Sequence, residues 1–234
     1  MSESRKNNSG LQNWGLLVVV LLGMYACKDG SSGAAIALDP ERKLPYIGEH
    51  EVEFVKKSDG ELIPDTVYYT LPKFSFINQD SAETSHRNYA GKVFVADFFF
   101  THCPSICPML SSQMVRLQAL TTKAGLHDEV MFLSHTVDPL RDSPDTLKNY
   151  AMALGADLSN WNFVTGSAED IYWQAEYGYM LTAFPSDSAE GGFFHTDKIA
   201  LIDRQMHIRG MYDGTSTKDV DKLFEDIKLL VKEK

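Results

Sequence analysis

Two cysteines in a short loop carry the clearest chemical signal of this sequence. Residues 93–116 read VFVADFFFTHCPSICPMLSSQMVR, in which an apolar run, a loop and a helical pattern follow one another. Pro108 fits the first helical position, because its missing N–H costs nothing there, so Cys107 is the expected N-cap and Cys103 lies just before it. The positive end of a helix lowers the pKa of a thiol and favours the thiolate. Such a pair suits redox chemistry or a soft metal.

The plainer alternatives for this pair are a structural disulfide or two small core residues. The loop also holds two prolines and a histidine at a strand-to-helix junction, which is unusual company for structural cysteines. Three residues separate the cysteines, one more than in a thioredoxin-type Cys-x-x-Cys, and this leaves room for both sulfurs to face one ion. Met109 and Met114 could add thioether ligands for copper, but both fit an apolar helical stripe and are expected in the core.

A histidine is the expected third ligand, because two thiolates and a neutral imidazole make a trigonal set that suits copper. His195 follows Gly-Gly-Phe-Phe and precedes an expected strand, so flexible glycines and two shielding aromatic rings come just before it. In thioredoxin-like folds the loop before this hairpin lies over the cysteine loop, which makes His195 a candidate. The other histidines have plainer expected roles: His102 points away, His135 is a hydrogen-bonded core residue, and the rest face solvent, namely His50, His86, His127 and His207.

Apolar runs and capped helical patterns alternate along the rest of the chain. Ser143-Pro144-Asp145 is a strong helix start, with a cap, a proline and an acidic first turn, and Gly155 can end that helix. The run at 130–137 lacks clean alternation, which is typical of a buried parallel strand. Further strands are expected at 67–71, 93–100, 161–165, 198–202 and 206–211, and further helices from 108, from 167 to about 177, and from 217 to about 232.

This order predicts one α/β domain, with a mixed central sheet flanked by helices on both faces. An N-terminal β-hairpin extension precedes the sheet, since Val52 and Phe54 alternate with charged residues. Binding sites of such sheets lie at the carboxyl ends of strands. Cys103, Cys107 and Asp138 all occupy such ends.

The composition narrows the function classes. A formal net charge of −10 argues against nucleic acid as a partner and suits a solvated surface or docking on basic patches. Three cysteines are too few for a disulfide-stapled scaffold. Two of them form the loop pair, and the third, Cys27, belongs to a separate pattern at the N-terminus.

The N-terminus is typical of an exported and anchored protein. A basic start and thirteen apolar residues at 14–26 are too short for a membrane-spanning helix and predict a signal peptide at 1–26. The following Cys27 resembles a bacterial lipobox cysteine, with an uncleaved short anchor or a free Cys27 as alternatives. Residues 27–43 are expected to form a lipid-anchored flexible tether, and 44–234 a domain in the cell envelope outside the cytoplasm. Thiols are not kept reduced there.

Taken together, these segments resemble the Sco/SenC family of copper-binding, thioredoxin-like proteins. The matching segments are VFVADFFFTHCPSICPML at 93–110, HTVDPLRDSPDTLKNYA at 135–151 and FHTDKIALID at 194–203. The resemblance implies that Cys103, Cys107 and His195 hold copper, as Cu(I), Cu(II) or both. It also implies that Asp138 supports the ligands or the conformation without binding metal, although Asp138 could equally cap the turn before Pro139.

The family resemblance further implies copper delivery to the binuclear copper centre of cytochrome c oxidase, with thiol–disulfide activity toward its cysteines. The expected partners are the copper-centre subunit, a copper donor chaperone, a thiol reductant and the membrane. Copper requires deprotonated thiols, so a Cys103–Cys107 disulfide would hold none and the redox state would gate transfer. A thiol–disulfide oxidoreductase and a redox or copper sensor remain alternatives. A peroxiredoxin-like peroxidase is disfavoured, because Phe100 replaces the threonine expected three residues before Cys103.

Overall fold

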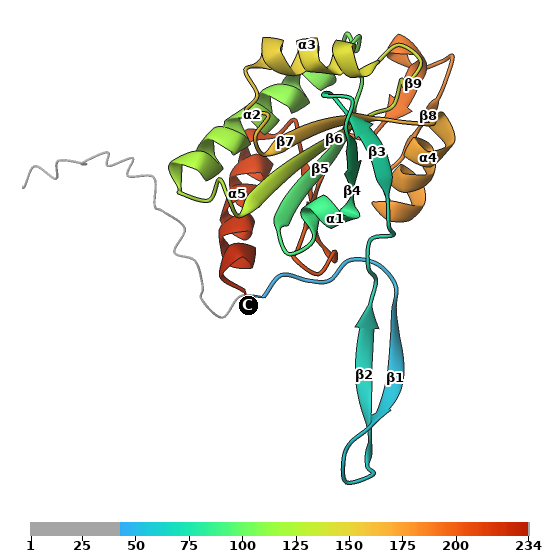
Figure 1. Ribbon diagram of the computed structural model, residues 1–234, viewed down its shortest axis with the longest axis vertical. Helices are drawn as coiled ribbons and strands as arrows, with labels where there is room; N and C mark the ends of the chain where they lie inside the picture. Colours follow the sequence, from blue (N-terminus) through green and yellow to red (C-terminus); the bar gives the residue numbers. More distant parts are fainter. Residues whose placement is uncertain (1–42, 234) are drawn as a thin grey trace, which may run out of the picture. The chain divides into compact units, whose positions relative to one another are not determined.

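The computed structural model describes residues 43–233, which contain a seven-stranded mixed sheet with helices on both faces (Figure 1). The expected signal peptide, Cys27 and all but the last residue of the expected tether lie outside the described residues. The strand order is β11-β10-β5-β6-β7-β3-β4. The strands are β3 (Ser75–Asn78), β4 (Glu83–Ser85), β5 (Val93–Phe99), β6 (Val130–Thr136), β7 (Trp161–Thr165), β10 (Lys198–Ile202) and β11 (Ile208–Asp213).

The parallel strands β5, β6 and β7 form the centre of the sheet, and β10, β11, β3 and β4 add antiparallel strands on either side. Every residue of β5 is buried, as expected for a strand covered on both faces. On one face, Phe99 stacks on Tyr150 of α3 (Pro144–Leu154), which packs with α2 (Cys107–Lys123). On the other, Phe98 meets Tyr179, just beyond α4 (Ala168–Trp173) and the π-helix η1 (Gln174–Gly178).

Local sequence signals set most helix boundaries. Ser143 caps α3 by accepting the N–H of Thr146, and Gly155 ends it in the left-handed conformation. The last helix, α5 (Thr217–Lys232), has the predicted bounds and packs on α2. The predicted cap of α2 is wrong by one residue: Ile106 is the N-cap, Cys107 is the first helical residue, and Pro108 is the second.

Several short elements were not predicted. They are β3, β4, α1 (His86–Tyr89), β8 (Ala183–Pro185), η2 (Glu190–Gly192) and β9 (Phe193–His195). Strands of three or four residues contain too few positions for a periodic pattern to be read. The helix expected to run to about 177 changes to η1 after Trp173, and the strand expected at 67–71 is observed as β2 (Leu62–Tyr68).

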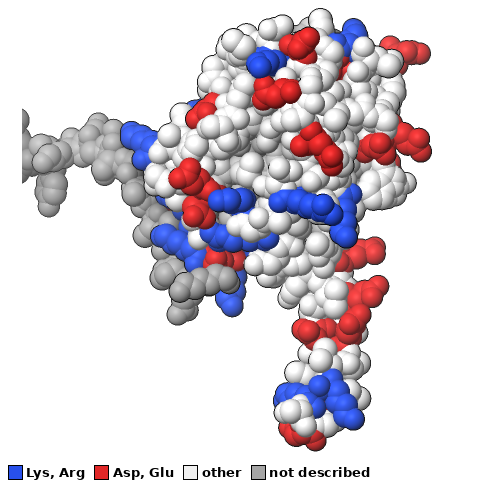
Figure 2. Space-filling view, in the orientation of Figure 1, with Lys and Arg blue, Asp and Glu red and all other residues white. Residues whose placement is uncertain are grey.

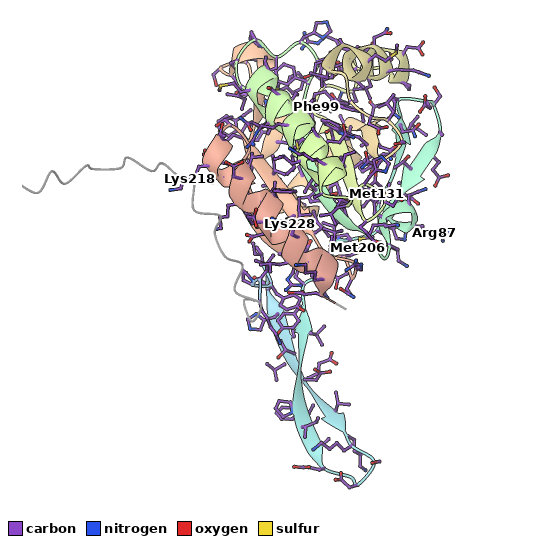
Figure 3. The ribbon with its side chains drawn as sticks, turned by 90° about the vertical axis from the view of Figure 1, so that its left-hand side faces the viewer. Arg87, Phe99, Met131, Met206, Lys218 and Lys228 are labelled. Carbon is purple, nitrogen blue, oxygen red and sulfur yellow. The ribbon has the colours of Figure 1, made fainter. Side chains whose placement is uncertain are left out.

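The predicted N-terminal hairpin is present as a projecting arm, which we define as β1 (His50–Lys56), β2 and the turn between them. The arm extends away from the sheet (Figure 1). Its base lies beside the turn between β10 and β11, since Leu71 N–H donates to the Met206 carbonyl oxygen at 2.8 Å. Met206 and Phe99, the last residue of β5, lie at opposite ends of the domain (Figure 3). The arm and the loop after β5 therefore occupy opposite ends.

No helix between residues 43 and 233 is long and apolar enough to cross a membrane.

Candidate metal centre

The cysteine loop joins β5 to α2 and is held in a fixed turn. Cys103 N–H donates to the Phe100 carbonyl oxygen at 3.3 Å. Cys103 is 9% exposed and Cys107 is 1% exposed, and both are free thiols. The structure therefore contains no disulfide between them, and a disulfide remains a prediction for their oxidised state. Because Cys107 opens α2, its sulfur is the deeper of the two.

His195 ends β9, which lies over the cysteine loop as the sequence predicted. Its Nδ1 lies 3.1 Å from the carbonyl oxygen of Thr196. A carbonyl oxygen only accepts, so the proton is on Nδ1 and the lone pair is on Nε2. Nε2 faces the sulfur of Cys107 at 3.4 Å. Burial lowers the pKa of His195, so the imidazole is neutral near pH 7 and its free nitrogen can bind a metal.

Cys103, Cys107 and His195 converge. Each offers one donor atom, and the three atoms lie within 4.8 Å of one another. It is the one such group of three or more histidine, cysteine or acidic side chains in the described part of the chain. Two sulfurs and a neutral imidazole are donors for a soft metal ion such as copper, and they leave a coordination position open.

The two thiols differ in acidity, which corrects the prediction that the helix terminus would lower both pKa values. Burial opposes ionisation of Cys103, but hydrogen bonds from the Cys107 thiol and from the backbone of Cys107 and Ser105 outweigh it, and its pKa falls. Burial raises the pKa of Cys107, and the neighbouring Cys103 and Asp97 raise it further. Cys103 is therefore the thiol that ionises first, and Cys107 stays protonated until a metal or a partner displaces its proton.

Aromatic side chains surround the histidine. Phe100 meets the His195 ring edge-on at 5.6 Å and packs on Phe193 at 5.3 Å. Gly191 has φ = 81°, and a Cβ atom there would come within 2.7 Å of the Phe100 ring, so the loop needs glycine at this point. Phe194 is half exposed and stacks on Phe184, so only Phe193 of the two predicted shielding rings packs inward.

An open cleft of about 390 Å³ leads from solvent to the site. Cys103 and His195 line it together with Phe193 and Phe194, whereas Cys107 does not. An incoming molecule therefore meets Cys103 and His195 first.

Asp138 follows the end of β6 and is buried. Its carboxylate pairs with the guanidinium of Arg141. Arg141 also reaches the Gly191 carbonyl oxygen at 3.5 Å and lies 6.0 Å from the centre of the Phe193 ring. The Asp138–Arg141 pair thus connects the end of β6 to the loop that leads into His195. The backbone carbonyl of Asp138 also closes the following turn by accepting from Asp142 N–H at 2.9 Å.

Asp142 anchors the cysteine loop. It accepts hydrogen bonds from Thr101 N–H at 3.1 Å, from Thr101 Oγ1 at 2.5 Å and from Thr136 Oγ1 at 2.5 Å, and it is fully buried. Thr101 is the second residue after β5, and Thr136 ends β6. Asp142 and Arg141 were not singled out from the sequence, although both belong to the Asp-Pro-x-Arg-Asp segment, in which only the first aspartate was given a role.

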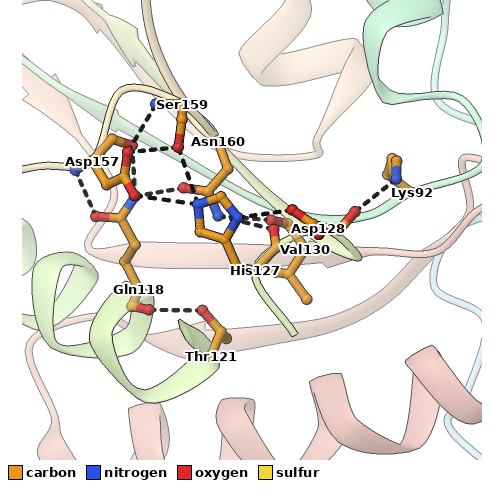
Figure 4. Close-up of polar contacts among 9 residues, drawn as sticks. All are labelled: Lys92, Gln118, Thr121, His127, Asp128, Val130, Asp157, Ser159 and Asn160. Carbon is orange, nitrogen blue, oxygen red and sulfur yellow. Dashed lines mark hydrogen bonds and ion pairs between the residues drawn. The ribbon is translucent and has the colours of Figure 1, made fainter. Parts of the chain in front are cut away.

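The remaining candidates lie outside the site. His127 binds Asp128 through Nδ1 at 3.0 Å, and Asp157 and Ser159 through Nε2 at 3.2 and 3.0 Å (Figure 4). This network joins the turns before β6 and β7, at the ends of the strands opposite the metal centre. His127 is therefore a turn-stabilising residue that is only partly solvated.

Two core predictions need correction. His135 is fully buried, but neither ring nitrogen has a hydrogen-bond partner among residues 43–233, contrary to the expected hydrogen-bonded histidine. It stacks on Phe98 at 4.7 Å, and burial lowers its pKa to about 3, so it is a neutral ring among aromatic rings. Met114 is a core residue as predicted, whereas Met109 is 54% exposed on the surface of α2. His207, expected to face solvent, is half-buried and bonds the Tyr69 carbonyl oxygen at 2.8 Å.

A sequence model of the SCO1/SenC family matches residues 65–232. Among known proteins, the chain is similar to a SCO1 protein homolog of Bacillus subtilis, with 27% identity over 175 residues that cover 75% of this chain and 90% of the relative. The family match includes the cysteine loop and the His195 segment. The family match begins at residue 65, so β1 and the turn of the arm lie outside it.

Solved structures of similar fold agree with the family match. A SCO1/SenC family lipoprotein from Bacillus anthracis is 33% identical, with a TM-score of 0.66, and the match covers 70% of this chain and 96% of that one. A second similar structure is BsSco, a member of the Sco family of cytochrome c oxidase assembly proteins in which a disulfide switch was identified. It is 29% identical, with a TM-score of 0.64, and the match covers 71% of this chain and 95% of that one. Bradyrhizobium japonicum ScoI, solved with copper bound, shares the fold at 23% identity and a TM-score of 0.58. The match covers 69% of this chain and 99% of that one. The predicted thioredoxin-like fold is confirmed.

Proposed function

This chain belongs to the SCO1/SenC family, and from that premise we propose that it binds copper through Cys103, Cys107 and His195 and delivers it to the binuclear copper centre of cytochrome c oxidase. The observation that carries the proposal is the convergence of the three donor atoms within 4.8 Å. The copper bound to a structural neighbour and the oxidase-assembly role of another support it. Copper is cargo here, so the site must both hold it and release it.

The burial of the three ligands suggests an order of transfer. Cys103 and His195 line the open cleft, whereas Cys107 lies behind them. Ligands of the acceptor therefore replace Cys103 and His195 first, and Cys107 releases the ion last. Because both thiols must lose their protons to bind copper and regain them on release, raising the pH favours the loaded protein.

A thiol–disulfide oxidoreductase is the second candidate, and the different acidities of the two thiols favour it. The Cys103 thiolate would attack a disulfide of the acceptor, forming a mixed disulfide and releasing one acceptor thiolate. Cys107, after losing its proton, would then attack the Cys103 sulfur, release the second acceptor thiolate and leave a Cys103–Cys107 disulfide. Two electrons pass to the acceptor, whose cysteines become competent to bind copper, and a thiol reductant restores the pair.

Replacing His195 with alanine separates these two candidates. We expect copper affinity to fall by about 10- to 100-fold, because a ligand is worth at least as much as the groups that orient it, while the rate of disulfide exchange with a small disulfide substrate is unchanged. The measurements are competition with a copper chelator and stopped-flow reduction. His127→Ala, far from the site, is the control.

The proposal for His195 would be wrong if the alanine variant kept full copper affinity and full oxidase assembly in cells. If either cysteine variant nevertheless abolished assembly, the oxidoreductase would be the better description.

The same proposal includes a place in the cell and the expected chain organisation. We propose a signal peptide at 1–26, a lipid anchor on Cys27 with a tether to residue 43, and a copper-binding domain from 44 onward, outside the cytoplasm of a bacterium. The lipoprotein from Bacillus anthracis supports this arrangement. A copper donor chaperone and a thiol reductant would then act on the domain at the membrane surface.

Arg141 gives a test of how the histidine loop is positioned. Arg141→Ala should weaken copper binding by about 10-fold, because it removes the connection between Asp138 and the loop before His195. Arg141→Lys keeps a charge beside Asp138 but loses the planar group near Phe193, and should show a smaller loss. The measurement is copper affinity together with the Cu(II) electron paramagnetic resonance spectrum, which reports whether nitrogen still binds.

Arg116→Ala is the matched control, since Arg116 forms an ion pair with Asp221 on the surface of α2 and α5. An Arg141→Ala variant with an unchanged spectrum and unchanged affinity would show that β9 holds His195 without this connection.

A further inference from the structure

The arm is firmly attached at its base. Ile47 pairs with Ile208 of β11, and the ring of His207 bonds the Tyr69 carbonyl oxygen at 2.8 Å. Tyr46 stacks on Tyr68 at 3.8 Å, and the guanidinium of Arg209 lies 4.2 Å from the Tyr46 ring. The base of the arm is therefore fixed in direction, which distinguishes it from a loosely connected insertion.

Beyond that base the arm is an unsupported two-stranded sheet. Phe54 is 68% exposed, Leu62 61% and Val52 56%. An isolated hairpin of two strands is marginally stable in water, and exposed apolar residues gathered on one face mark an interaction site. Such an exposed apolar surface is typical of an element that binds another molecule.

The strand register separates the side chains into two faces, because residues directly opposite each other share a face. One face is mostly apolar and carries no carboxylate. It consists of the cross-strand pairs His50–Tyr68, Val52–Thr66, Phe54–Pro64 and Lys56–Leu62. The other face holds Glu51–Val67, Glu53–Asp65 and Val55–Ile63.

On the second face, three carboxylates stand together without a cation. Glu53 lies directly opposite Asp65, and Glu51 follows two residues away on the same strand. Like charges directly opposite destabilise a sheet. Among the described residues, none of the three forms an ion pair; the one ion pair within the arm joins Lys57 and Glu61 at its tip, 3.0 Å apart. Figure 2 shows acidic side chains along the arm and lysines near its free end. A basic surface against this face would remove the repulsion.

The proposed copper function does not explain why the chain has the arm. The family match begins at residue 65 and omits β1 and the turn. The arm also lies at the end of the domain opposite the metal centre (Figure 3). The surface that the arm offers is therefore separate from the cleft lined by Cys103 and His195.

We propose that the arm inserts into a groove of a partner protein, one that offers an apolar wall to Phe54 and Leu62 and lysine or arginine side chains to Glu53 and Asp65. Seven residues per strand give a length of about 23 Å, and both faces and both open edges together give roughly 700–900 Å². This matches the ~800 Å² that each partner buries in a standard interface. The partner holds the domain from behind and leaves the metal cleft free.

Two other occupants fit the arm less well. A second copy stacked on the apolar face would cover only roughly 230 Å² of each arm, well below that requirement. Insertion between two copies would also bring the acidic faces together. A lipid surface is disfavoured because residues 50–68 contain five acidic residues and two lysines, and bacterial and other anionic membranes repel such a segment.

The test is a photo-crosslinker at a defined position. p-Benzoylphenylalanine replaces Phe54 in the full chain, expressed in native host cells. Met152, which is 66% exposed on α3, is the matched control position. We expect one partner protein to be attached from position 54 and not from 152. The purified partner should bind the full chain about 10-fold more weakly after Phe54→Ser, the loss typical of one apolar contact residue.

Glu53→Gln distinguishes recognition from a structural role. Removing the charge relieves repulsion in the free arm, so the unfolding midpoint should stay the same or rise, while partner affinity falls and becomes less sensitive to salt. A structural role would move stability and affinity in the same direction. Copper binding of both variants should equal that of the wild type, so a failure here is separate from a failure of the proposed copper function.

Four results would overturn the inference. They are attachment of the label to phospholipid, to a second copy of the chain or to residues 1–42 of the same chain, and the absence of any product specific to position 54. An interaction whose affinity is unchanged by Phe54→Ser and Glu53→Gln would also contradict it.

Discussion

Serine at position 107 should abolish the strong thiolate-to-Cu(II) absorption of the loaded protein and reduce copper affinity by at least about 100-fold, the upper range found for groups that merely orient a ligand. A hydroxyl is a hard, weakly acidic donor and does not replace a thiolate for a soft metal. Cys107 is also the deepest of the three donors, 3.4 Å from Nε2 of His195. Its loss leaves the ion with Cys103 and His195 at the open cleft. Absorption spectra and chelator competition on the reduced domain measure both effects.

The fold should survive this change, so the loss can be assigned to the ligand. Serine is only slightly smaller than cysteine, and its hydroxyl can donate a hydrogen bond to the same ring nitrogen of His195. Thr121→Ala is the control, because Thr121 is buried on the same helix and does not belong to the donor set. If a Cys107→Ser variant retained both the absorption band and the copper affinity, Cys107 would not be a copper ligand. The two cysteines would then be better described as a dithiol redox pair.

The cysteine loop could be predicted from the sequence because its signals are local. A buried strand, two prolines and an apolar helical stripe fix a strand-to-helix junction without help from the rest of the chain. The cap of α3 at Ser143 is equally local and was correct to the residue. The pKa values of the two thiols, in contrast, do not follow from the local sequence. Cys107 lies at the positive end of α2, yet burial under the His195 loop outweighs the helix and raises its pKa.

The convergence of His195 with the cysteines depends on long-range topology. β10 pairs antiparallel with β5, and this brings the segment before β10 to the end of β5, where the cysteine loop begins. Periodicity within either strand does not contain that information. Family resemblance supplied it, and the structure agrees with it. The contacts of Arg141 and Asp142 are of the same kind, because each joins the end of β6 to a loop far away in the sequence.

Asp97 carries the second large expected effect. It is buried in the middle of β5, and its Oδ1 accepts a hydrogen bond from Ser134 Oγ at 2.5 Å, while Ser134 Oγ accepts from Trp161 Nε1 at 2.9 Å. Burial raises the pKa of Asp97 to about 7, and the hydrogen bond from Ser134 only partly offsets it. In the unfolded chain an aspartate titrates near 3.9. The folded protein therefore binds this proton more tightly than the unfolded chain does.

The sign of the pH dependence follows directly. The stability linked to this proton is fully present below about pH 4 and is lost as the pH rises to about 7, where the buried carboxylate must ionise. Asp97→Asn keeps the shape and an oxygen that can accept from Ser134, but it has no charge to bury. The advantage of the variant over the wild type in unfolding free energy should therefore grow by about 2–3 kcal/mol between pH 5 and pH 8.

Urea unfolding of both proteins between pH 5 and 8 measures this difference. A flat difference for Asp97→Asn would mean that its carboxyl titrates in the folded protein as it does in water. Above about pH 7 the charge of Asp97 also acts on the metal centre, because it is the smallest of the causes that raise the pKa of Cys107. Burial is the largest cause, so a metal ion that replaces the thiol proton must offset the cost of burying the thiolate first and the repulsion from Asp97 second.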